Sequence, residues 1–247
     1  MTGVSFDRQA VTFSACFNFR ELGGYPTAGG AAVRTGQLYR SDSLHRLSGA
    51  DLDRLAALGI RTVLDLRTDR EVTADGGCPA GGVDVLRFPL DDALGGVDQP
   101  LALAYVATVE AQRDVIASAV VALADPAARP AVFHCTSGRD RTGILAALVL
   151  DLLGVADDVV AADYVLSVDS RRARDAYLRE HEPERAAFFA SLPASVLAID
   201  ASTMELFLRE LRARHGSVRA LLEAGGAPAA ALDRLVDDLV DRATGIE

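Results

Sequence analysis

Residues 134–143 read His-Cys-Thr-Ser-Gly-Arg-Asp-Arg-Thr-Gly, and the residues on either side indicate how this run is folded. The apolar residues 130–133 before it are typical of a strand. The residues after it, 144–153, have an unbroken helical pattern that stops at Gly154. A strand, a loop of small residues and a helix, in this order, direct several backbone N–H groups and a helix N-terminus at one point. The sequence therefore predicts an oxyanion site in this loop.

Two side chains of the loop are suited to phosphoryl transfer. The helix N-terminus, the converging amides and Arg141 should favour the thiolate of Cys135, which is the attacking form. The planar guanidinium of Arg141 can hold two phosphoryl oxygens at once. These donors would face the equatorial oxygens that carry the charge as a phosphoryl group moves to sulfur. The pattern predicts hydrolysis of phosphate monoesters through a cysteinyl-phosphate intermediate.

The other loop residues are expected to shape the loop or to bind phosphate. Gly138 permits a backbone turn that other residues would strain. Thr142 should place a hydroxyl near the sulfur, where it can stabilise the leaving thiolate in the second step. Thr136 and Ser137 are further predicted phosphate contacts. We expect Arg139 to contact the substrate beyond the phosphate, with simple solvent exposure as the alternative. Cys-x5-Arg spacing alone is weak, because an inert buried cysteine also fits it; the flanking residues give the pattern its specificity.

The segment resembles the signature of cysteine-dependent tyrosine and dual-specificity phosphatases, His-Cys-x-x-Gly-x-x-Arg-Thr-Gly. With Asp140 before the arginine, it is most similar to the atypical bacterial tyrosine and lipid phosphatases, the tyrosine-protein phosphatase B-like group. That group's loop usually reads Gly-Lys-Asp-Arg, where this chain has Gly-Arg-Asp-Arg. Other segments similar to the group are residues 18–25 (Asn-Phe-Arg-Glu-Leu-Gly-Gly-Tyr), 38–42, 63–68 and 215–218. The resemblance covers about residues 15–225 and implies the cysteine-phosphatase fold.

Strands alternate with helices along the first part of the chain. The pattern predicts strands at 38–40, 60–66, 84–88 and 131–134. It predicts helices at 49–58 and 100–124, and then at 157–167, 170–180, 183–192, 202–215, 217–223 and 228–242. This order predicts an α/β fold with a central, mostly parallel sheet flanked by helices, and a helical C-terminal half over 155–247. We expect one phosphatase domain over 1–247.

The net charge of the chain limits the classes of molecule that it is expected to bind. The net charge is −10, and all 25 basic residues are arginine. Such a protein is not drawn to nucleic acid, and we expect no nucleic-acid partner. An anion site must then rely on local positive charge, and the arginines in or near motif segments are Arg20, Arg40, Arg67, Arg139 and Arg141.

The expected cellular location and cofactors are inferred from sequence features that are missing. Without a run of 18 apolar residues or a signal-peptide pattern, we expect a cytoplasmic protein with no stable membrane insertion. The resemblance leaves export without a signal peptide open. The three cysteines, Cys16, Cys78 and Cys135, suggest neither a disulfide framework nor a zinc site, so no cofactor and no metal are expected.

Protonation of the leaving oxygen requires a general acid opposite the thiolate, and the sequence offers two places for it. Asp140 lies in the loop, and the resemblance implies that this aspartate is functionally important. Its alternative role is to pair with Arg139 or to orient the substrate. Asp91 and Asp92 follow the strand pattern in a loop like the one that carries the acid in many related phosphatases. The alternative role for these two aspartates is to cap a helix or to lie in a solvated turn.

Three further parts of the sequence have open interpretations. Arg20 can reach the phosphate or brace the loop, whereas an ion pair with Glu21 or Asp65 is the alternative. The arginines of 171–174 are typical of a solvated helix face, because aspartates flank them. For residues 182–200 the resemblance implies a helical lid over the loop, and a plain packing helix is the alternative. The adjacent Phe188 and Phe189 cannot both face inward on a helix, so one should remain partly exposed.

Three functions remain in view. The first is a phosphatase acting on phosphotyrosine, with phosphoserine and phosphothreonine as further substrates. The second moves the substrate to phosphoinositides or inositol phosphates, which the resemblance allows and which the second basic residue, Arg139, suits. The third, a phospho-binding module without turnover, is disfavoured because Cys135 and Arg141 are both present. The expected partner is therefore a phosphorylated protein or a phosphoinositide.

Overall fold

The computed structural model describes residues 10–91, 99–193 and 197–241. Its five-stranded sheet has the order β1-β3-β6-β4-β5, in which only β1 is antiparallel to its neighbour. The strands are β1 (Arg20–Glu21), β3 (Leu38–Ser41), β6 (Ala131–His134), β4 (Thr62–Asp65) and β5 (Asp84–Arg87). Two short strands, β2 (Ala32–Val33) and β7 (Val240–Asp241), pair separately near the two ends of the chain. The predicted α/β fold with a mostly parallel sheet is confirmed.

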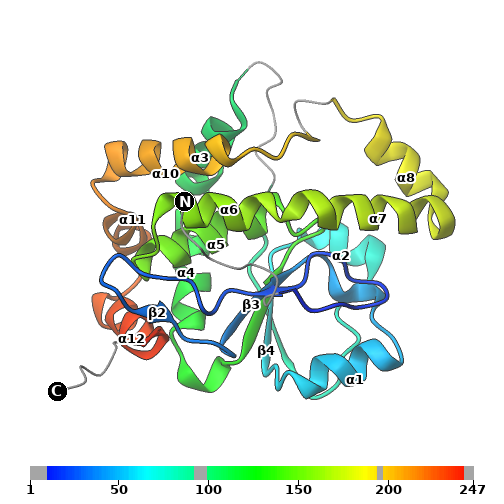
Figure 1. Ribbon diagram of the computed structural model, residues 1–247, viewed down its shortest axis with the longest axis horizontal. Coiled ribbons are helices and arrows are strands. Elements are labelled where there is room, and N and C mark those ends of the chain that lie inside the picture. The colour runs from blue at the N-terminus through cyan, green and yellow to red at the C-terminus, as the bar shows by residue number, and fades with distance from the viewer. Residues whose placement is uncertain (1–9, 92–98, 194–196, 242–247) are drawn as a thin grey trace.

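Helices form most of the remaining structure (Figure 1). The first four are α1 (Ala50–Ala57), α2 (Asp69–Asp75), α3 (Leu101–Ala111) and α4 (Arg113–Leu123). Then come α5 (Asp140–Leu152), α6 (Asp157–Val165), α7 (Ser167–His181) and α8 (Pro183–Ala190). The last are α10 (Ala201–His215), α11 (Val218–Ala224) and α12 (Ala229–Leu239). The helical C-terminal half is confirmed, apart from the short β7.

The central strands separate two apolar cores, because successive residues of a strand point to opposite faces. Leu64 and Phe133 join the larger core, which is formed with α3–α6 and α10–α12. Their neighbours Val63 and Val132 join the smaller core, on the side of α1 and the N-terminal segment. Every residue of β4 and β6 is buried, as expected for central parallel strands with both faces covered. The loop after β6 therefore starts from a rigid strand.

The structure corrects the sequence pattern in two places. The predicted helix over 100–124 is divided at Gln112, whose side-chain amide bonds the backbone N–H and carbonyl of Asp91 at 2.7 and 3.1 Å. The sequence reading also omitted α2, which begins at Thr68 with a capping box. Both differences lie at the carboxyl ends of the parallel strands β4 and β5, the edge where α/β proteins bind their ligands.

The helices of the described residues include none with the length and apolar character needed to cross a membrane.

Candidate active site

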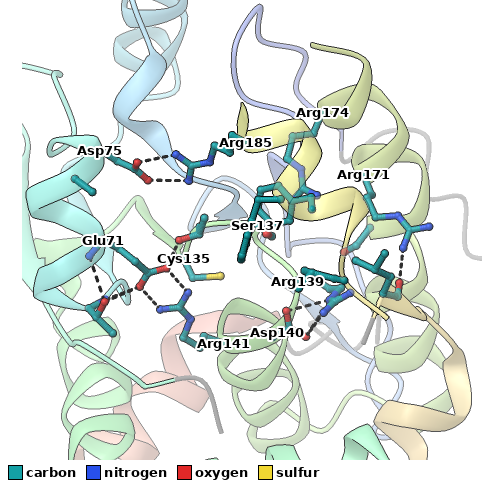
Figure 2. Close-up of a pocket in the computed structure, with 18 of the residues that line it drawn as sticks. Glu71, Asp75, Cys135, Ser137, Arg139, Asp140, Arg141, Arg171, Arg174 and Arg185 are labelled. Carbon is teal, nitrogen blue, oxygen red and sulfur yellow. Dashed lines mark hydrogen bonds and ion pairs between the residues drawn. The ribbon is translucent and has the colours of Figure 1, made fainter. Parts of the chain in front are cut away.

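A cavity of about 850 Å3 opens at the loop between β6 and α5. Cys135 lies at the start of this loop and is only 2% exposed, yet it lines the cavity. The other walls come from α2, α7 and α8, with apolar side chains of Leu192, Leu197 and Ile199. Figure 2 shows Cys135 between the Glu71–Arg141 pair and the Arg139–Asp140 pair. The predicted nucleophile, Cys135, thus lies buried at the floor of a cavity that is open to solvent.

The backbone of the loop offers donors at this floor. Among the described residues, no hydrogen-bond acceptor pairs with the backbone N–H groups of loop residues 136–139. Further along the loop, the backbone N–H of Gly143 donates to the carbonyl of Arg139 at 2.8 Å, where α5 begins. A row of unbonded amides beside a thiol and a guanidinium forms a binding site for an oxyanion. Thr136 and Ser137, two of the predicted phosphate contacts, line the cavity.

Gly138 has the special conformation that the sequence predicts. Its φ is +65°, in the left-handed region that side chains disfavour. A Cβ there would lie 2.5 Å from the carbonyl oxygen of Ser41 and 2.6 Å from the amide nitrogen of Asp42. The loop therefore packs directly on the backbone at the end of β3, and only glycine fits this contact.

The carbonyl of Gly138 is held by two buried side chains from the N-terminal part of the chain. Asn18 donates to it through Nδ2 at 2.9 Å, and Arg40 donates through Nη2 at 2.8 Å. Because the peptide group is planar and trans, fixing this carbonyl directs the N–H of Arg139 to the opposite side. The two donors thereby set the orientation of one amide of the oxyanion site.

Asp163 of α6 holds this bracing network together. Its carboxylate accepts from Arg20 Nε at 2.8 Å, Arg40 Nη1 at 2.5 Å and the Tyr25 hydroxyl at 2.9 Å. Burial alone would raise the pKa of Asp163, but the charges of Arg20 and Arg40 outweigh it and lower the pKa to about 2. Asp163 is therefore an ionised, fully buried anchor that the sequence analysis did not identify.

This arrangement agrees with one of the alternatives for Arg20, a brace behind the loop, and not with a phosphate contact or an ion pair with Glu21 or Asp65. Arg20 does not line the cavity; its guanidinium is 3% exposed and is engaged by Asp163 and by Asn18 Oδ1. Its acidic partner is neither Glu21 nor Asp65. The side chain braces the loop from behind, and because it does not line the cavity it does not face the substrate.

Arg141 projects into the cavity and pairs with Glu71 of α2. The two nitrogens Nη1 and Nη2 meet the two carboxylate oxygens at 2.6 and 2.7 Å, in a bidentate pair. The Thr136 hydroxyl also donates to Glu71. Burial would raise the pKa of Glu71, but the hydrogen bonds and charge of Arg141 outweigh it and hold that pKa well below its usual range. Glu71 is therefore ionised, and its carboxylate orients Arg141.

Glu71 is the principal site residue that sequence reasoning missed. A signal for it exists, since Thr68-x-x-Glu71 is a capping box at the start of α2. The backbone N–H of Thr68 donates to Glu71 Oε2 at 2.8 Å, and Glu71 N donates back to the Thr68 hydroxyl at 3.3 Å. The cap fixes the carboxylate in the place where it meets Arg141. Only the structure, however, brings this cap to the loop.

Asp140, the predicted catalytic aspartate, lines the cavity at the first position of α5. Arg139 Nε lies 2.9 and 3.0 Å from its two carboxylate oxygens, and the buried Tyr105 hydroxyl also donates to it. Tyr105 in turn lies 3.0 Å from the Tyr164 hydroxyl. The pair with Arg139 is the role that the sequence analysis gave as the alternative to acid catalysis by Asp140, and both residues line the cavity.

The other predicted residues that the structure describes lie outside the cavity lining. Asp91 is exposed and contacts Gln112 through its backbone, while Asp92 lies outside the described residues. Thr142 is fully buried, and its hydroxyl has no hydrogen-bond partner among the described residues. His134 is also buried; burial lowers its pKa to about 4, and its Nδ1 lies 3.1 Å from the Cys135 carbonyl oxygen.

Only two of the five arginines expected to supply local positive charge, Arg139 and Arg141, line the cavity. Arg40 is bound to Asp163, and the buried Arg67 is bound to Asp65 at 2.7 Å, so neither faces the cavity. The arginines that line the cavity are Arg70, Arg139, Arg141, Arg171, Arg174 and Arg185. The prediction of a solvated face over 171–174 is therefore wrong for Arg174, which is 6% exposed. It holds for Arg172, whose side chain is 74% exposed.

The segment predicted as a lid contributes α8 to one wall of the cavity. Phe188 and Phe189 both line the cavity; Phe188 is 61% exposed, which confirms that one of the two remains open to solvent. Arg185 of α8 binds Asp75 of α2 at 2.6 and 2.8 Å, as Figure 2 shows. In Figure 1, α8 (yellow) lies beside the far end of α7.

Comparison with known proteins agrees with this geometry. The model of the tyrosine phosphatase family matches residues 11–241. A candidate tyrosine-protein phosphatase of Cupriavidus necator is 32% identical over 228 residues, covering 85% of this chain and 82% of that protein. The triple specificity protein phosphatase PtpB of Mycobacterium tuberculosis is 30% identical over 265 residues, covering 89% and 95%. Among solved structures, the Siw14 catalytic core overlaps with a TM-score of 0.40 at 12% identity, covering 84% of this chain and 96% of that one.

Proposed function

This chain belongs to the tyrosine phosphatase family, and on that premise we propose that it hydrolyses phosphotyrosine in proteins through a covalent intermediate on Cys135. The observation that carries the proposal is the floor of the cavity. There, the thiol of Cys135, the amides of residues 136–139 and the guanidinium of Arg141 converge. Phosphoserine and phosphothreonine are proposed as further substrates. We also propose that residues 1–247 act as one domain and that the protein works in the cytoplasm.

The proposed reaction has two steps. In the first, the Cys135 thiolate attacks phosphorus, an S–P bond forms, and the P–O bond to the tyrosine oxygen breaks while a general acid protonates that oxygen. In the second, water attacks the cysteinyl phosphate and gives a proton to the conjugate base of the general acid, the S–P bond breaks, and inorganic phosphate and the thiolate are released. The loop amides and Arg141 hold the equatorial oxygens in both steps. The buried Thr142 hydroxyl is the proposed donor to the leaving sulfur.

The first expected result concerns substrate class. The protein should hydrolyse a phosphotyrosine peptide, with slower hydrolysis of the matched phosphoserine peptide, and EDTA should not change either rate because no step uses a metal. Initial rates on these peptides and on a short-chain phosphoinositide make the comparison. Turnover of the phosphoinositide alone would favour the alternative, a phosphoinositide or inositol phosphate phosphatase. Binding of phosphopeptide without release of phosphate would favour a phospho-binding module.

We propose Asp140 as the general acid, because its carboxylate lines the cavity whereas Asp91 does not. Asp140→Asn should slow hydrolysis of phosphate esters with poor leaving groups by roughly 10²–10⁴-fold, the usual contribution of a general acid. It should slow activated aryl phosphates far less, because their leaving oxygen needs no proton.

Asp91→Asn is the matched control, and it should leave the leaving-group dependence as it is in the parent. Rates across a series of aryl phosphates with different phenol pKa values provide the measurement. A leaving-group dependence that appears in Asp91→Asn or Asp92→Asn instead would move the acid to that loop. Equal losses on all substrates in all three variants would exclude both assignments.

We further propose that residues 182–200 act as a lid. Two ion pairs that hold this segment to the rest of the protein support this: Arg185 of α8 with Asp75, and Glu182, directly before α8, with Arg46 at 2.5 Å. Apart from Phe189, which packs under Arg174 at 4.4 Å, the helix is held mostly by these charged contacts, and none of its residues is fully buried. Such an element can open without exposing the core.

Deletion of residues 184–192 should make Cys135 several-fold more sensitive to peroxide, because the lid shields the thiolate from solvent. The measurement is the rate of inactivation by hydrogen peroxide, compared with the parent after circular dichroism has shown that the variant is folded. A folded deletion variant that is inactivated no faster than the parent contradicts a shielding lid and leaves α8 as a packing helix.

A further inference from the structure

The charges that line the cavity do not balance. Six arginines line it together with three carboxylates, in a chain whose net charge is −10. Each carboxylate is already bound to one of those arginines: Glu71 to Arg141, Asp75 to Arg185 and Asp140 to Arg139. The arginines without a carboxylate in the lining are Arg70, Arg171 and Arg174. Two of these three lie on the same helix, α7.

The two α7 arginines share one face of the helix. Ser167, Arg171 and Arg174 are spaced by four and three residues, which places them in line along α7, and all three line the cavity. In Figure 2, Arg171 and Arg174 lie across the cavity from Glu71 and Asp75. The α7 face thus forms a basic wall opposite the wall formed by α2.

Arg174 is fixed in position but is not fully hydrogen-bonded. Its guanidinium lies 4.4 Å from the centre of the Phe189 ring, and its Nη2 donates to Asp175 at 2.9 Å. Its side chain is 7% exposed, and its Nε has no hydrogen-bond partner among the described residues. A buried guanidinium N–H without an acceptor is unfavourable, because its desolvation is not compensated. An anionic acceptor at this wall would remove that cost.

Arg171 is half-buried and held by an uncharged partner. Its Nη1 donates to the carbonyl oxygen of Leu197, and no carboxylate pairs with it among the described residues. A guanidinium held by a carbonyl keeps its full positive charge and has further N–H groups to donate. Arg171, which has no carboxylate partner among the described residues, and Arg174, whose partner Asp175 lies outside the cavity lining and leaves Nε unpaired, therefore present guanidinium N–H groups beside the phosphate loop.

We propose that Arg171 and Arg174 form a second anion subsite, which binds a negatively charged group located next to the phosphotyrosine in the same peptide. This inference rests on the proposed function and narrows its substrate class to phosphotyrosine peptides with an acidic or phosphorylated neighbour. A residue two or three positions away in an extended peptide lies about 7–11 Å from the phosphotyrosine. The cavity, at about 850 Å3, is near the upper end of the range for ligand sites, roughly 300–1,000 Å3, so it can hold more than one side chain.

A peptide fits the walls of this cavity better than an inositol headgroup does. Apolar side chains cover the side next to the α7 arginines, and Phe188, Phe189, Leu192, Leu197 and Ile199 all belong to this group. The ring of a phosphotyrosine and the aliphatic part of a neighbouring residue can pack on such a surface. A headgroup whose hydroxyls and phosphates point outward in every direction would leave these side chains against polar groups.

Binding to the catalytically inactive Cys135→Ser protein tests the subsite without depending on turnover. Two phosphotyrosine peptides are compared, one with glutamates two and three positions from the phosphotyrosine and one with glutamines there. The glutamate peptide should bind on the order of tenfold more tightly, a difference that corresponds to about 1.4 kcal/mol. The preference should decrease with added salt, because it arises from charge.

Arg171→Met and Arg174→Met should each reduce the ratio of the two dissociation constants towards one. Arg172→Met is the matched control on the same helix, because Arg172 is 74% exposed and pairs with Asp169 instead of facing the cavity. It should keep the ratio of the parent. If the buried Arg174 variant does not fold, Arg171→Met and the salt dependence in the unchanged chain still decide the question.

Three outcomes would overturn the subsite. These are equal binding of the two peptides, a ratio that survives both Arg171→Met and Arg174→Met, or an equal loss in Arg172→Met. Tighter binding of a phosphatidylinositol bisphosphate headgroup, dependent on the same two arginines, would overturn the assignment to peptides. Failure of the proposed function looks different: the active protein would then hydrolyse neither peptide nor a simple aryl phosphate, whatever the binding ratio.

Discussion

Replacing Cys135 by serine should abolish turnover, with a loss on the order of 10⁴-fold or more, as is typical when a nucleophile is removed. A serine hydroxyl at this position has no adjacent base to activate it and is a far weaker nucleophile than a thiolate. Phosphate binding should remain close to that of the parent, because the loop amides and Arg141 are unchanged. Rates on an aryl phosphate and a phosphate titration measure the two effects separately.

Cys78→Ser is the control for this experiment. Cys78 is half-buried, belongs to the edge of the smaller core and does not line the cavity, so its replacement should leave the rate unaffected. Activity of Cys135→Ser within tenfold of the parent would contradict a covalent mechanism. A loss of phosphate binding as large as the loss of rate would mean that the loop itself had been distorted.

Replacing Gly138 by alanine should cost nearly as much activity, although no reacting group is removed. The new Cβ would lie within 2.6 Å of the backbone at Ser41 and Asp42, and backbone atoms cannot rotate away as a side chain would. The loop must therefore shift, and a displacement of about 1 Å at a catalytic site costs on the order of 10²-fold in rate. We expect kcat/KM and phosphate affinity to fall together.

Gly216→Ala is the control that separates two effects of an added Cβ: the steric clash with neighbouring backbone, and the free-energy cost of a positive φ. Gly216 also has a positive φ, +80°, but a Cβ there would meet nothing within 4 Å. Both substitutions should lower thermal stability, by about 1–2 kcal/mol for the left-handed conformation alone. Only Gly138→Ala should lose activity and phosphate binding. A Gly138→Ala protein that binds phosphate as well as the parent does would show that the loop tolerates the shift.

The sequence predicted those features of the site that depend only on residues close together in the chain. The strand, the glycine turn and the helix around Cys135 are local, so their pattern gave the loop, its nucleophile and its arginine correctly. The helix boundaries after residue 155 were close for the same reason. The capping box at Thr68 and Glu71 was equally local, but the sequence does not indicate that it would lie against Arg141.

The parts that failed depend on partners far apart in the chain. Arg20 was considered with its neighbours Glu21 and Asp65, whereas its carboxylate is supplied by Asp163, 143 residues away. The arginines of α7 looked solvated because aspartates flank them in sequence, and only the packing of α8 turns Arg174 inward. A buried arginine needs a carboxylate partner, but the spacing of residues in the sequence rarely identifies which carboxylate it is.

The bracing network also bears on how the protein reaches its active form. The contacts that orient the loop join residues 98 to 143 positions apart, from Asn18, Arg20 and Arg40 to Gly138 and Asp163. Contacts of such high sequence separation form late, since a long loop must close before they contribute to stability. A nascent chain that has not yet released α6 from the ribosome contains Cys135, Arg141 and the two donors to Gly138, but it lacks Asp163, which fixes Arg40 in place. The enzyme is therefore expected to acquire activity only near the end of its folding, after its sheet is already in place.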